Sequence, residues 1–246
     1  MCWLDVMGTA QLMLRSLPIG ANFVFKLHCA VLEAQEELNL DRDIRLYPVM
    51  DGVFITSARR NPLQRLLNQA LCRLALTFLG EPQPFHRFLV RGAIAFGPLF
   101  HGSSLPDDIS HVLKRHQYIR DSILMGIPMA QAYQGEREAP PFGIAAEASA
   151  RAFSPERDRP FRFLWLDWFR HCSPSVDPSA MLAKLEEYFE WHSNHTNLTA
   201  YDIKRIEHHR QLAREYFTAS ASRAEESPTT GSSEQSSADA PDCRSP

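Results

Sequence analysis

The sequence predicts an α+β fold in which an antiparallel sheet carries helices on one face. Short apolar runs with strand-like composition alternate with longer segments whose apolar residues recur at helical spacing. An Asp-Gly pair, Asp51 and Gly52, also stands between two apolar runs. Such a pair is typical of a type I′ hairpin turn, in which both central residues take positive φ.

The N-terminal part of the chain supplies a strand, a helix and the hairpin. Residues 2–7 form a short strand that Gly8 ends, and residues 18–38 follow as a helix with a polar face of glutamates. The two strands of the hairpin are residues 44–50 and 53–56.

Clear end signals bound the next helix. Asn61 is a suitable cap, Pro62 suits the first turn, and Gly80 ends the helix. Residues 87–100 follow as the longest strand region. The glycines inside it, among them Gly92, predict bulges or close approach of neighbouring backbone.

Shorter elements follow. Residues 103–119 are polar and indicate an inserted loop with some helix, and residues 127–134 are predicted to form a helix. Residues 142–146 are predicted to form a strand that leads into a short helix, and residues 161–168 a last strand. The resulting order, β-α-β-β-α-β-α-β, predicts a ferredoxin-like core.

The character of the sequence changes after residue 170. We expect residues 1–170 to form the main domain and residues 171–218 a C-terminal helical extension, whose first helix opens at Asp177. Residues 219–246 consist mostly of Ser, Ala, Glu, Pro and Thr, which bury too little apolar surface to offset the entropy of ordering. This segment is therefore predicted to be a disordered tail.

Composition excludes several classes of protein. The chain has 246 residues and a formal net charge of −3, which argues against a dedicated nucleic-acid binder. Its five cysteines are scattered without a CxxC pair, as in a cytoplasmic protein with reduced thiols. No stretch approaches the ~20 apolar residues of a membrane span. We therefore expect a cytoplasmic protein without nucleic-acid or membrane partners.

Two strand-borne aspartates are the main chemical lead. Asp51 has an ordinary explanation, because aspartate is common in tight turns. Asp5 is harder to explain, since an acid inside an apolar strand is costly unless it is paired or liganded. Arg91, in the strand region at residues 87–100, is as consistent with a phosphate pocket as with a structural ion pair.

Three blocks together resemble the catalytic domain of the class III nucleotidyl cyclases, in a divergent form. They are WLDVMG at residues 3–8, YPVMDGV at residues 47–53 and LVRGAIAFG at residues 89–97, with weaker support from residues 125–132. Each block is weak alone, but their order and spacing are those of the family. The resemblance implies a palm-type core, in which the first strand and the hairpin each carry a metal-binding acid.

The resemblance also implies a site. Asp5 and Asp51, with Val6 beside Asp5, match the positions that hold two Mg²⁺ or Mn²⁺ ions. Carboxylates suit these hard cations, and two ions about 4 Å apart stabilise the attacking and leaving oxygens of a phosphoryl reaction.

For the nucleotide, the resemblance implies that backbone amides around Met7, Gly8 and Thr9 face the phosphates and that Tyr47 lies at the base-reading position. Arg91 is the candidate catalytic arginine, which could line the phosphate pocket. Because class III sites form between two subunits, a homodimer is implied as well.

Four family positions differ in this chain. The purine-reading lysine is replaced by Tyr47, and the second base-reading acid by Ile123; the ribose and transition-state residues fall at Ala130 and Gln134. Losing one preorganised charge near a developing phosphorane costs on the order of 10²–10³ in rate. Replacement would have to come from another polar side chain, such as Arg87, Arg91, Arg120 or Gln131.

The sequence therefore predicts a protein that binds a nucleoside triphosphate with a divalent cation and forms a cyclic nucleotide if it is active. The alternative is a catalytically inactive cyclase-fold module that serves as a binding or scaffold protein, and a metal-dependent phosphodiester hydrolase is a more distant one. The C-terminal histidines, His192, His195, His208 and His209, match no standard zinc spacing, and we interpret them as part of a polar helix face.

Overall fold

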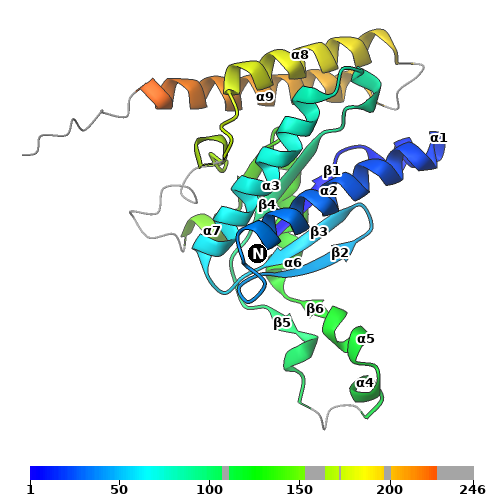
Figure 1. Ribbon diagram of the computed structural model, residues 1–246, viewed down its shortest axis with the longest axis vertical. Helices are drawn as coiled ribbons and strands as arrows, with labels where there is room; N and C mark the ends of the chain where they lie inside the picture. The colour runs from blue at the N-terminus through cyan, green and yellow to red at the C-terminus, as the bar shows by residue number, and fades with distance from the viewer. Residues whose placement is uncertain (107–110, 153–163, 172, 197–200, 226–246) are drawn as a thin grey trace, which may run out of the picture.

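The computed structural model describes residues 1–106, 111–152, 164–171, 173–196 and 201–225. The sheet lies in the middle of the molecule, a small two-stranded arm projects from one end, and a pair of long helices covers the other end (Figure 1).

Five strands form the central sheet in the order β2-β3-β1-β4-β7. Neighbouring strands are antiparallel except β4 and β7, which are parallel. The order β-α-β-β-α-β is observed for β1 to β4, with β3 inserted between the parallel strands β1 and β2. The α+β class is therefore confirmed, although the sheet is mixed and not purely antiparallel. The bounds are Cys2–Val6 (β1), Arg45–Val49 (β2), Gly52–Thr56 (β3), Val90–Ile94 (β4) and Ile144–Ala146 (β7).

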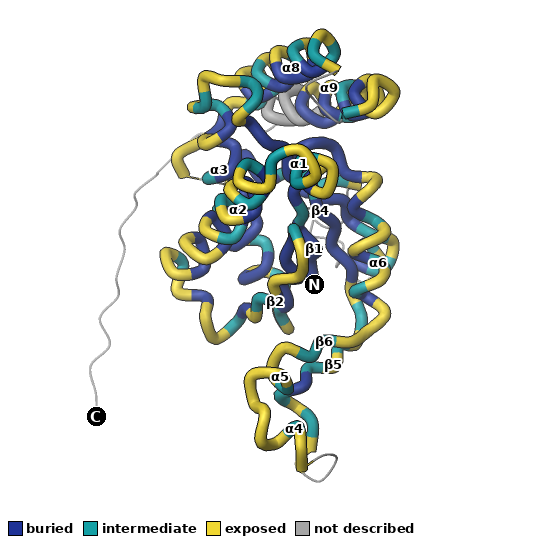
Figure 2. Tube along the Cα trace, turned by 90° about the vertical axis from the view of Figure 1, so that its right-hand side faces the viewer, coloured by how far each residue is buried: buried dark blue, intermediate teal, exposed yellow. Residues whose placement is uncertain are grey.

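Two long helices, α2 (Leu17–Glu37) and α3 (Arg60–Gly80), cover one face of the sheet (Figures 1 and 2). A short helix, α1 (Thr9–Arg15), precedes α2 and was not predicted. Successive residues of a strand point to opposite faces, so alternate residues of β1, such as Leu4, enter the core under these helices.

The opposite face is covered too. Helix α6 (Ile127–Gly135) packs there against β1 and β4, and Figure 2 shows the two strands between α6 and α2. Trp3, Tyr47 and Phe54 form a second apolar cluster under α6. The prediction of helices on one face only is therefore wrong, because these alternate strand residues are themselves large and apolar and need cover.

The predicted long strand at residues 87–100 is interrupted. Only β4 belongs to the central sheet, while β5 (Phe100–His101) pairs with β6 (Leu124–Met125) in the projecting arm. The arm also carries η2 (Gly102–Ser104), α4 (His111–Arg115) and α5 (Gln117–Ser122). Pro98 lies between the two strands, and a proline cannot donate to a sheet ladder.

Helix α8 (Pro178–Asn194) begins at the predicted place. The Asp177 side chain accepts hydrogen bonds from the backbone N–H groups of Ser179 and Ala180. Helix α9 (Ile203–Glu225) runs past residue 218, where the helical extension was expected to end. Residues 226–246 of the predicted tail lie outside the described residues.

The C-terminal helices share the main core. Apolar residues of α8 and α9 belong to the same buried cluster as β1 and α3; they are Met181, Leu185, Tyr188, Phe189, Ile206, Ala213, Tyr216 and Phe217. The remaining short helices are η1 (Pro84–His86), η3 (Glu136–Glu138), α7 (Ala148–Ala152) and η5 (Phe169–His171).

The predicted last strand is not formed where the chain is described. Residues 161–163 lie outside the described residues, and Trp165 makes only an isolated antiparallel bridge with Ala145.

Helix α2 is the one helix in the described part of the chain that is long and apolar enough, by length and composition, to cross a membrane. It also packs against α3, β1 and β3, with residues such as Leu27 and Ala34 fully buried. A core helix of this kind passes the same test, so α2 gives no support for a membrane partner.

Candidate functional site

Asp5 occupies the central strand of the sheet. It lies opposite Gly52 of β3 on one side and opposite Arg91 of β4 on the other. Because Asp5 and Trp3 are two residues apart, they share the face that α6 covers. The carboxylate is half-buried, and its Oδ1 atom is buried without a hydrogen-bond partner.

Asp51 is brought to Asp5 by the hairpin, although the turn differs from the prediction. Val49 pairs with Gly52, so the two turn residues are Met50 and Asp51. Met50 has a φ of 50°, and Asp51 is not among the residues with positive φ, which is the pattern of a type II′ turn and not of type I′.

Gly52 itself has a packing role. A Cβ atom at this position would lie 2.4 Å from the Trp3 ring and 2.6 Å from the Leu4 carbonyl oxygen. The glycine therefore lets β3 approach β1 closely, directly beside Asp5.

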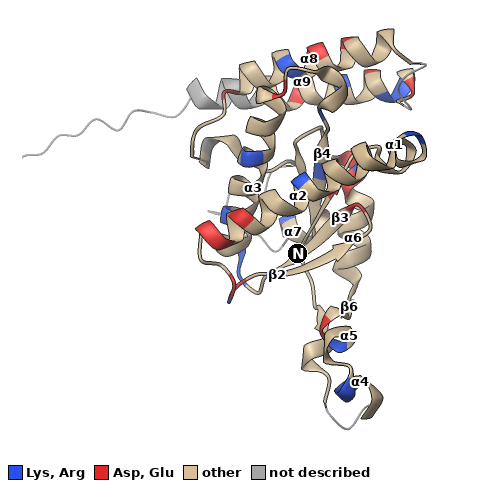
Figure 3. Cartoon of the chain, turned by 45° about the vertical axis from the view of Figure 1, so that its right-hand side comes forward, with Lys and Arg blue, Asp and Glu red and all other residues tan. Residues whose placement is uncertain are grey.

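A third carboxylate, Glu136 of η3, completes the acidic cluster. Glu136 is buried; it accepts a hydrogen bond from Trp3 Nε1 over 3.0 Å and one from Arg91 Nη2 over 2.6 Å. Figure 3 shows acidic positions gathered where β3 and β4 meet the region of α1. The sequence contains no signal for Glu136, since its place follows only once α6 is known to cross the second face.

The cluster changes the protonation of Asp5. Burial first, then the charges of Glu136 and Asp51 and a hydrogen bond with Glu136, raise the pKa of Asp5 to about 9, and Arg91 opposes this rise. Three carboxylates face one guanidinium, so the fully ionised cluster carries a formal charge of −2. Such a cluster favours either a shared proton or a bound cation.

The residues present fit a nucleotide-carried divalent cation. Mg²⁺ commonly takes one or two protein carboxylates and completes its coordination with water and substrate phosphates. Asp5 and Asp51 supply two carboxylates, and the unpartnered Oδ1 of Asp5 is a free oxygen ligand. Over the described residues, no three His, Cys, Asp or Glu side chains are gathered as a metal site of their own.

Arg91 also reaches the C-terminal helices. Its Nη1 atom lies 3.5 Å from Nε2 of His209, and Nδ1 of His209 makes a short hydrogen bond with the hydroxyl of Tyr201. Burial, followed by the charge of Arg91, lowers the pKa of His209 to about 3. His209 is therefore a buried neutral side chain and not part of a polar helix face.

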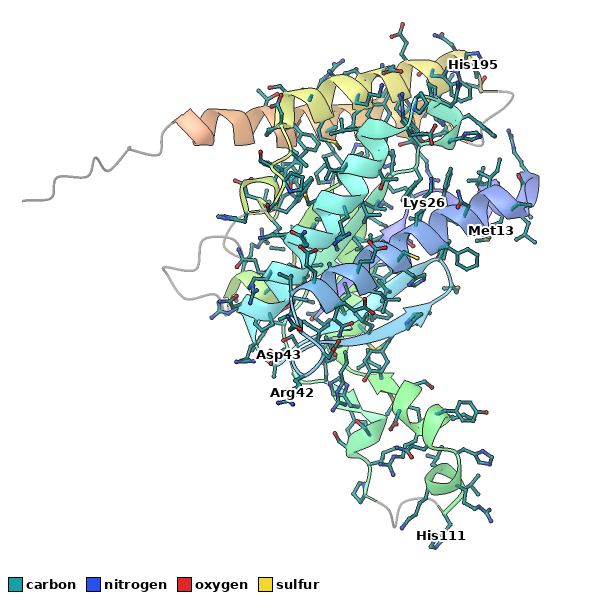
Figure 4. The ribbon with its side chains drawn as sticks, in the orientation of Figure 1. Met13, Lys26, Arg42, Asp43, His111 and His195 are labelled. Atoms are coloured by element: carbon teal, nitrogen blue, oxygen red, sulfur yellow. The ribbon has the colours of Figure 1, made fainter. Side chains whose placement is uncertain are left out.

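His192 and His195 contact other residues of α8 and do not bond to Arg91. His192 is buried within α8, where its ring lies against Tyr188, and His195 stacks on Trp191 at the end of the same helix (Figure 4).

The backbone groups predicted to face phosphates are partly engaged. The Met7 N–H donates to the Leu89 carbonyl, and the Val6 carbonyl accepts a 2.6 Å hydrogen bond from the Thr9 hydroxyl. Gly8 has a φ of 76° at the start of α1.

Tyr47 does not join the acidic cluster. It is buried in the apolar cluster under α6, and its hydroxyl lies 2.7 Å from Nδ1 of His101.

The proposed replacement residues also have other partners. Arg87 is buried; it forms an ion pair with Glu187 of α8 and donates to the carbonyls of Glu81 and Pro82. Arg120 donates to the Ser103 carbonyl in the arm. Of the four replacement candidates, the acidic cluster contains Arg91.

Comparisons with models of protein families, with curated proteins and with solved structures find no match. A proposal for the class of protein therefore has to rest on the three sequence blocks and on the geometry of the site.

Proposed function

We propose that this chain is a divergent nucleotidyl cyclase-like protein that binds a nucleoside triphosphate together with Mg²⁺ or Mn²⁺ at Asp5 and Asp51. The observation that carries the proposal is the strand register, in which Asp5 lies opposite Gly52 and thus next to Asp51. The β-α-β-β-α-β order supports a palm-type core, in which acids of the first strand and of the hairpin hold the cation.

The chemistry of the cluster supports a cation as the primary ligand. A bound divalent cation would neutralise the triphosphate and compensate the excess of carboxylates around Asp5. Arg91 is the one guanidinium of the cluster and a donor for a phosphate oxygen. In this proposal Asp5 and Asp51 hold the cation, and Arg91 orients the phosphates.

Further parts of the proposal follow from the family resemblance. The protein acts as a homodimer, and its product, when it turns over, is a cyclic nucleotide. In this proposal the protein is cytoplasmic, which the scattered cysteines support. The base preference stays open, because Tyr47 stands where the family has a purine-reading lysine and its hydroxyl lies 2.7 Å from Nδ1 of His101.

A second candidate is a catalytically inactive cyclase-fold module that serves as a binding or scaffold protein. The ion pair between Arg91 and Glu136 favours it, because the guanidinium is already neutralised in the absence of nucleotide. Two substitutions at the family positions favour it as well: Ala130 lacks the amide of the family's asparagine, and Gln134 lacks the charge of the family's arginine.

Thermal melting with each nucleoside triphosphate, with and without Mn²⁺, tests nucleotide binding. We expect a cation-dependent rise in Tm for the wild type and for Asp41→Asn, an exposed control, but not for Asp5→Asn or Asp51→Asn. Absence of a shift in the wild type, or equal shifts in all four proteins, would contradict the proposal.

Release of pyrophosphate from the four nucleoside triphosphates then separates the two candidates. Release that depends on Asp5 and Asp51 identifies a cyclase-type enzyme. Binding without release identifies the inactive module.

A further inference from the structure

We propose that His209, on the C-terminal helix α9, is a positioning residue that holds the guanidinium of Arg91 beside Asp5. This inference rests on the proposed function, since Arg91 is there the phosphate donor. It makes the C-terminal helices contribute a residue to the nucleotide site, although the sequence predicted them to be an extension separate from the main domain.

The direction of the hydrogen bonds fixes the state of His209. A guanidinium has only donors, so Nε2 of His209 must accept from Arg91 Nη1. The neutral ring then carries its proton on Nδ1 and donates it to the Tyr201 hydroxyl. Arg91 thus sets the tautomer of His209, and the Tyr201 hydroxyl, which can accept from Nδ1–H, helps to fix the orientation of the ring.

Arg91 is held from its other side by Glu136. Nη2 donates to Glu136 over 2.6 Å, and Glu136 is in turn fixed by the indole N–H of Trp3. The guanidinium is thus bonded both to the carboxylate of Glu136, on η3, and to the imidazole of His209, on α9. This arrangement restrains the Arg91 side chain before a ligand binds. Binding then costs less conformational entropy than it would with a freely rotating arginine.

The restrained guanidinium leaves one buried nitrogen atom, Nε, without a partner. Arg91 Nε is buried and unbonded, and so is Oδ1 of Asp5, the residue directly opposite in the strand register. A phosphate oxygen on the first atom and a cation on the second would satisfy both together. Loosening Arg91 is therefore expected to weaken binding of the cation–nucleotide complex more than it weakens the fold.

The chain provides a matched control next to His209. His208 is exposed on the same turn of α9, whereas His209 is buried. His209→Leu removes the acceptor with similar bulk. His209→Gln keeps an oxygen acceptor near the position of Nε2.

The test measures the Kd of Mn²⁺–nucleoside triphosphate by titration calorimetry, with the free energy of unfolding of each variant measured in parallel. We expect the Kd of His209→Leu to rise about tenfold, the Kd of His209→Gln to stay within roughly threefold of wild type, and His208→Leu to be unchanged. Rescue by glutamine distinguishes positioning from general loss of packing.

A second measurement uses the wild type alone. Nitrogen NMR of the imidazole rings is expected to show His209 as the Nδ1–H tautomer. An Nε2–H tautomer, or a wild-type Kd in His209→Leu, would overturn the inference. Wild-type protein that binds no nucleotide would instead overturn the proposed function, and the inference with it.

Discussion

Arg91 of β4 lies directly opposite Asp5 of β1, yet its guanidinium forms its ion pair with Glu136, over 2.6 Å. Asp5 is thus left with a buried, unbonded oxygen and two neighbouring carboxylates. The stability of the sheet is therefore coupled to the chemistry of the site, because a proton or a cation is needed to neutralise the charge of Asp5.

The first prediction concerns pH. The folded-state pKa of Asp5 is about 9, above the value near 3.9 of an unfolded aspartate, so the folded state keeps a proton that the unfolded state releases. The contribution of this group to stability is therefore full below about pH 4 and is lost progressively as pH rises to about 9. Urea unfolding of Asp5→Asn at pH 8 should give a free energy of unfolding higher by roughly 1–2 kcal/mol than wild type.

The same series at pH 5 provides the check. The advantage of Asp5→Asn should be smaller there than at pH 8. A variant less stable than wild type at both pH values would show that Asp5 is held as a well-compensated carboxylate.

The second prediction concerns the close approach of β1 and β3. Gly52→Ala places a Cβ atom 2.4 Å from the Trp3 ring, so we expect a loss of roughly 2–4 kcal/mol in the free energy of unfolding. Gly80→Ala is the control, because nothing lies within 4 Å of its added Cβ. Equal stabilities in chemical denaturation would contradict the packing assigned to Gly52.

The third prediction separates Arg87 from the site. Arg87→Met should lower the free energy of unfolding by about 3 kcal/mol, because Glu187 and the carbonyls of Glu81 and Pro82 lose their donor. The Tm shift produced by Mn²⁺–nucleotide should remain. Exposed Arg65 supplies the control variant, Arg65→Met, and loss of the nucleotide shift in Arg87→Met alone would assign Arg87 to binding.

The fourth prediction concerns the C-terminal helices. A chain ending at residue 176 exposes the core that α8 and α9 cover, including Trp168 and Phe169, and should fail to show cooperative unfolding. A chain ending at residue 225 should melt within a few degrees of the full-length protein. A stable 1–176 fragment would support the separate extension that the sequence suggested.

Local patterns were sufficient for most elements of the fold. Pro62 and Gly80 marked the two ends of α3 within a residue or two, and Asp177 capped α8 as expected. The cap predicted at Asn61 was wrong, because Asn61 lies inside α3 and Arg59 is at its N-cap.

The hairpin was also predicted, but not its turn type. Turn geometry depends on the register of the strands, in which Val49 pairs with Gly52 and leaves Met50 and Asp51 as the turn residues.

The second layer of helix and the third carboxylate were not predictable. Both depend on α6 crossing the far face of the sheet, and a nine-residue amphipathic segment does not reveal which face it covers. His209 was interpreted as polar surface for the same reason: its burial depends on packing of α9 beside Arg91, 118 residues away in sequence. Asp5 stood out in the sequence because an acid in an apolar strand is costly wherever the strand lies, and Asp51 was paired with it through the family resemblance.

Equilibrium dialysis with Mn²⁺ and a nucleoside triphosphate is the direct test of a cation–nucleotide site at Asp5 and Asp51. We expect wild type and Asp41→Asn to retain cation and nucleotide together, and Asp5→Asn and Asp51→Asn to retain neither. Wild type that retains neither ligand, or aspartate variants that retain both as well as wild type does, would contradict it.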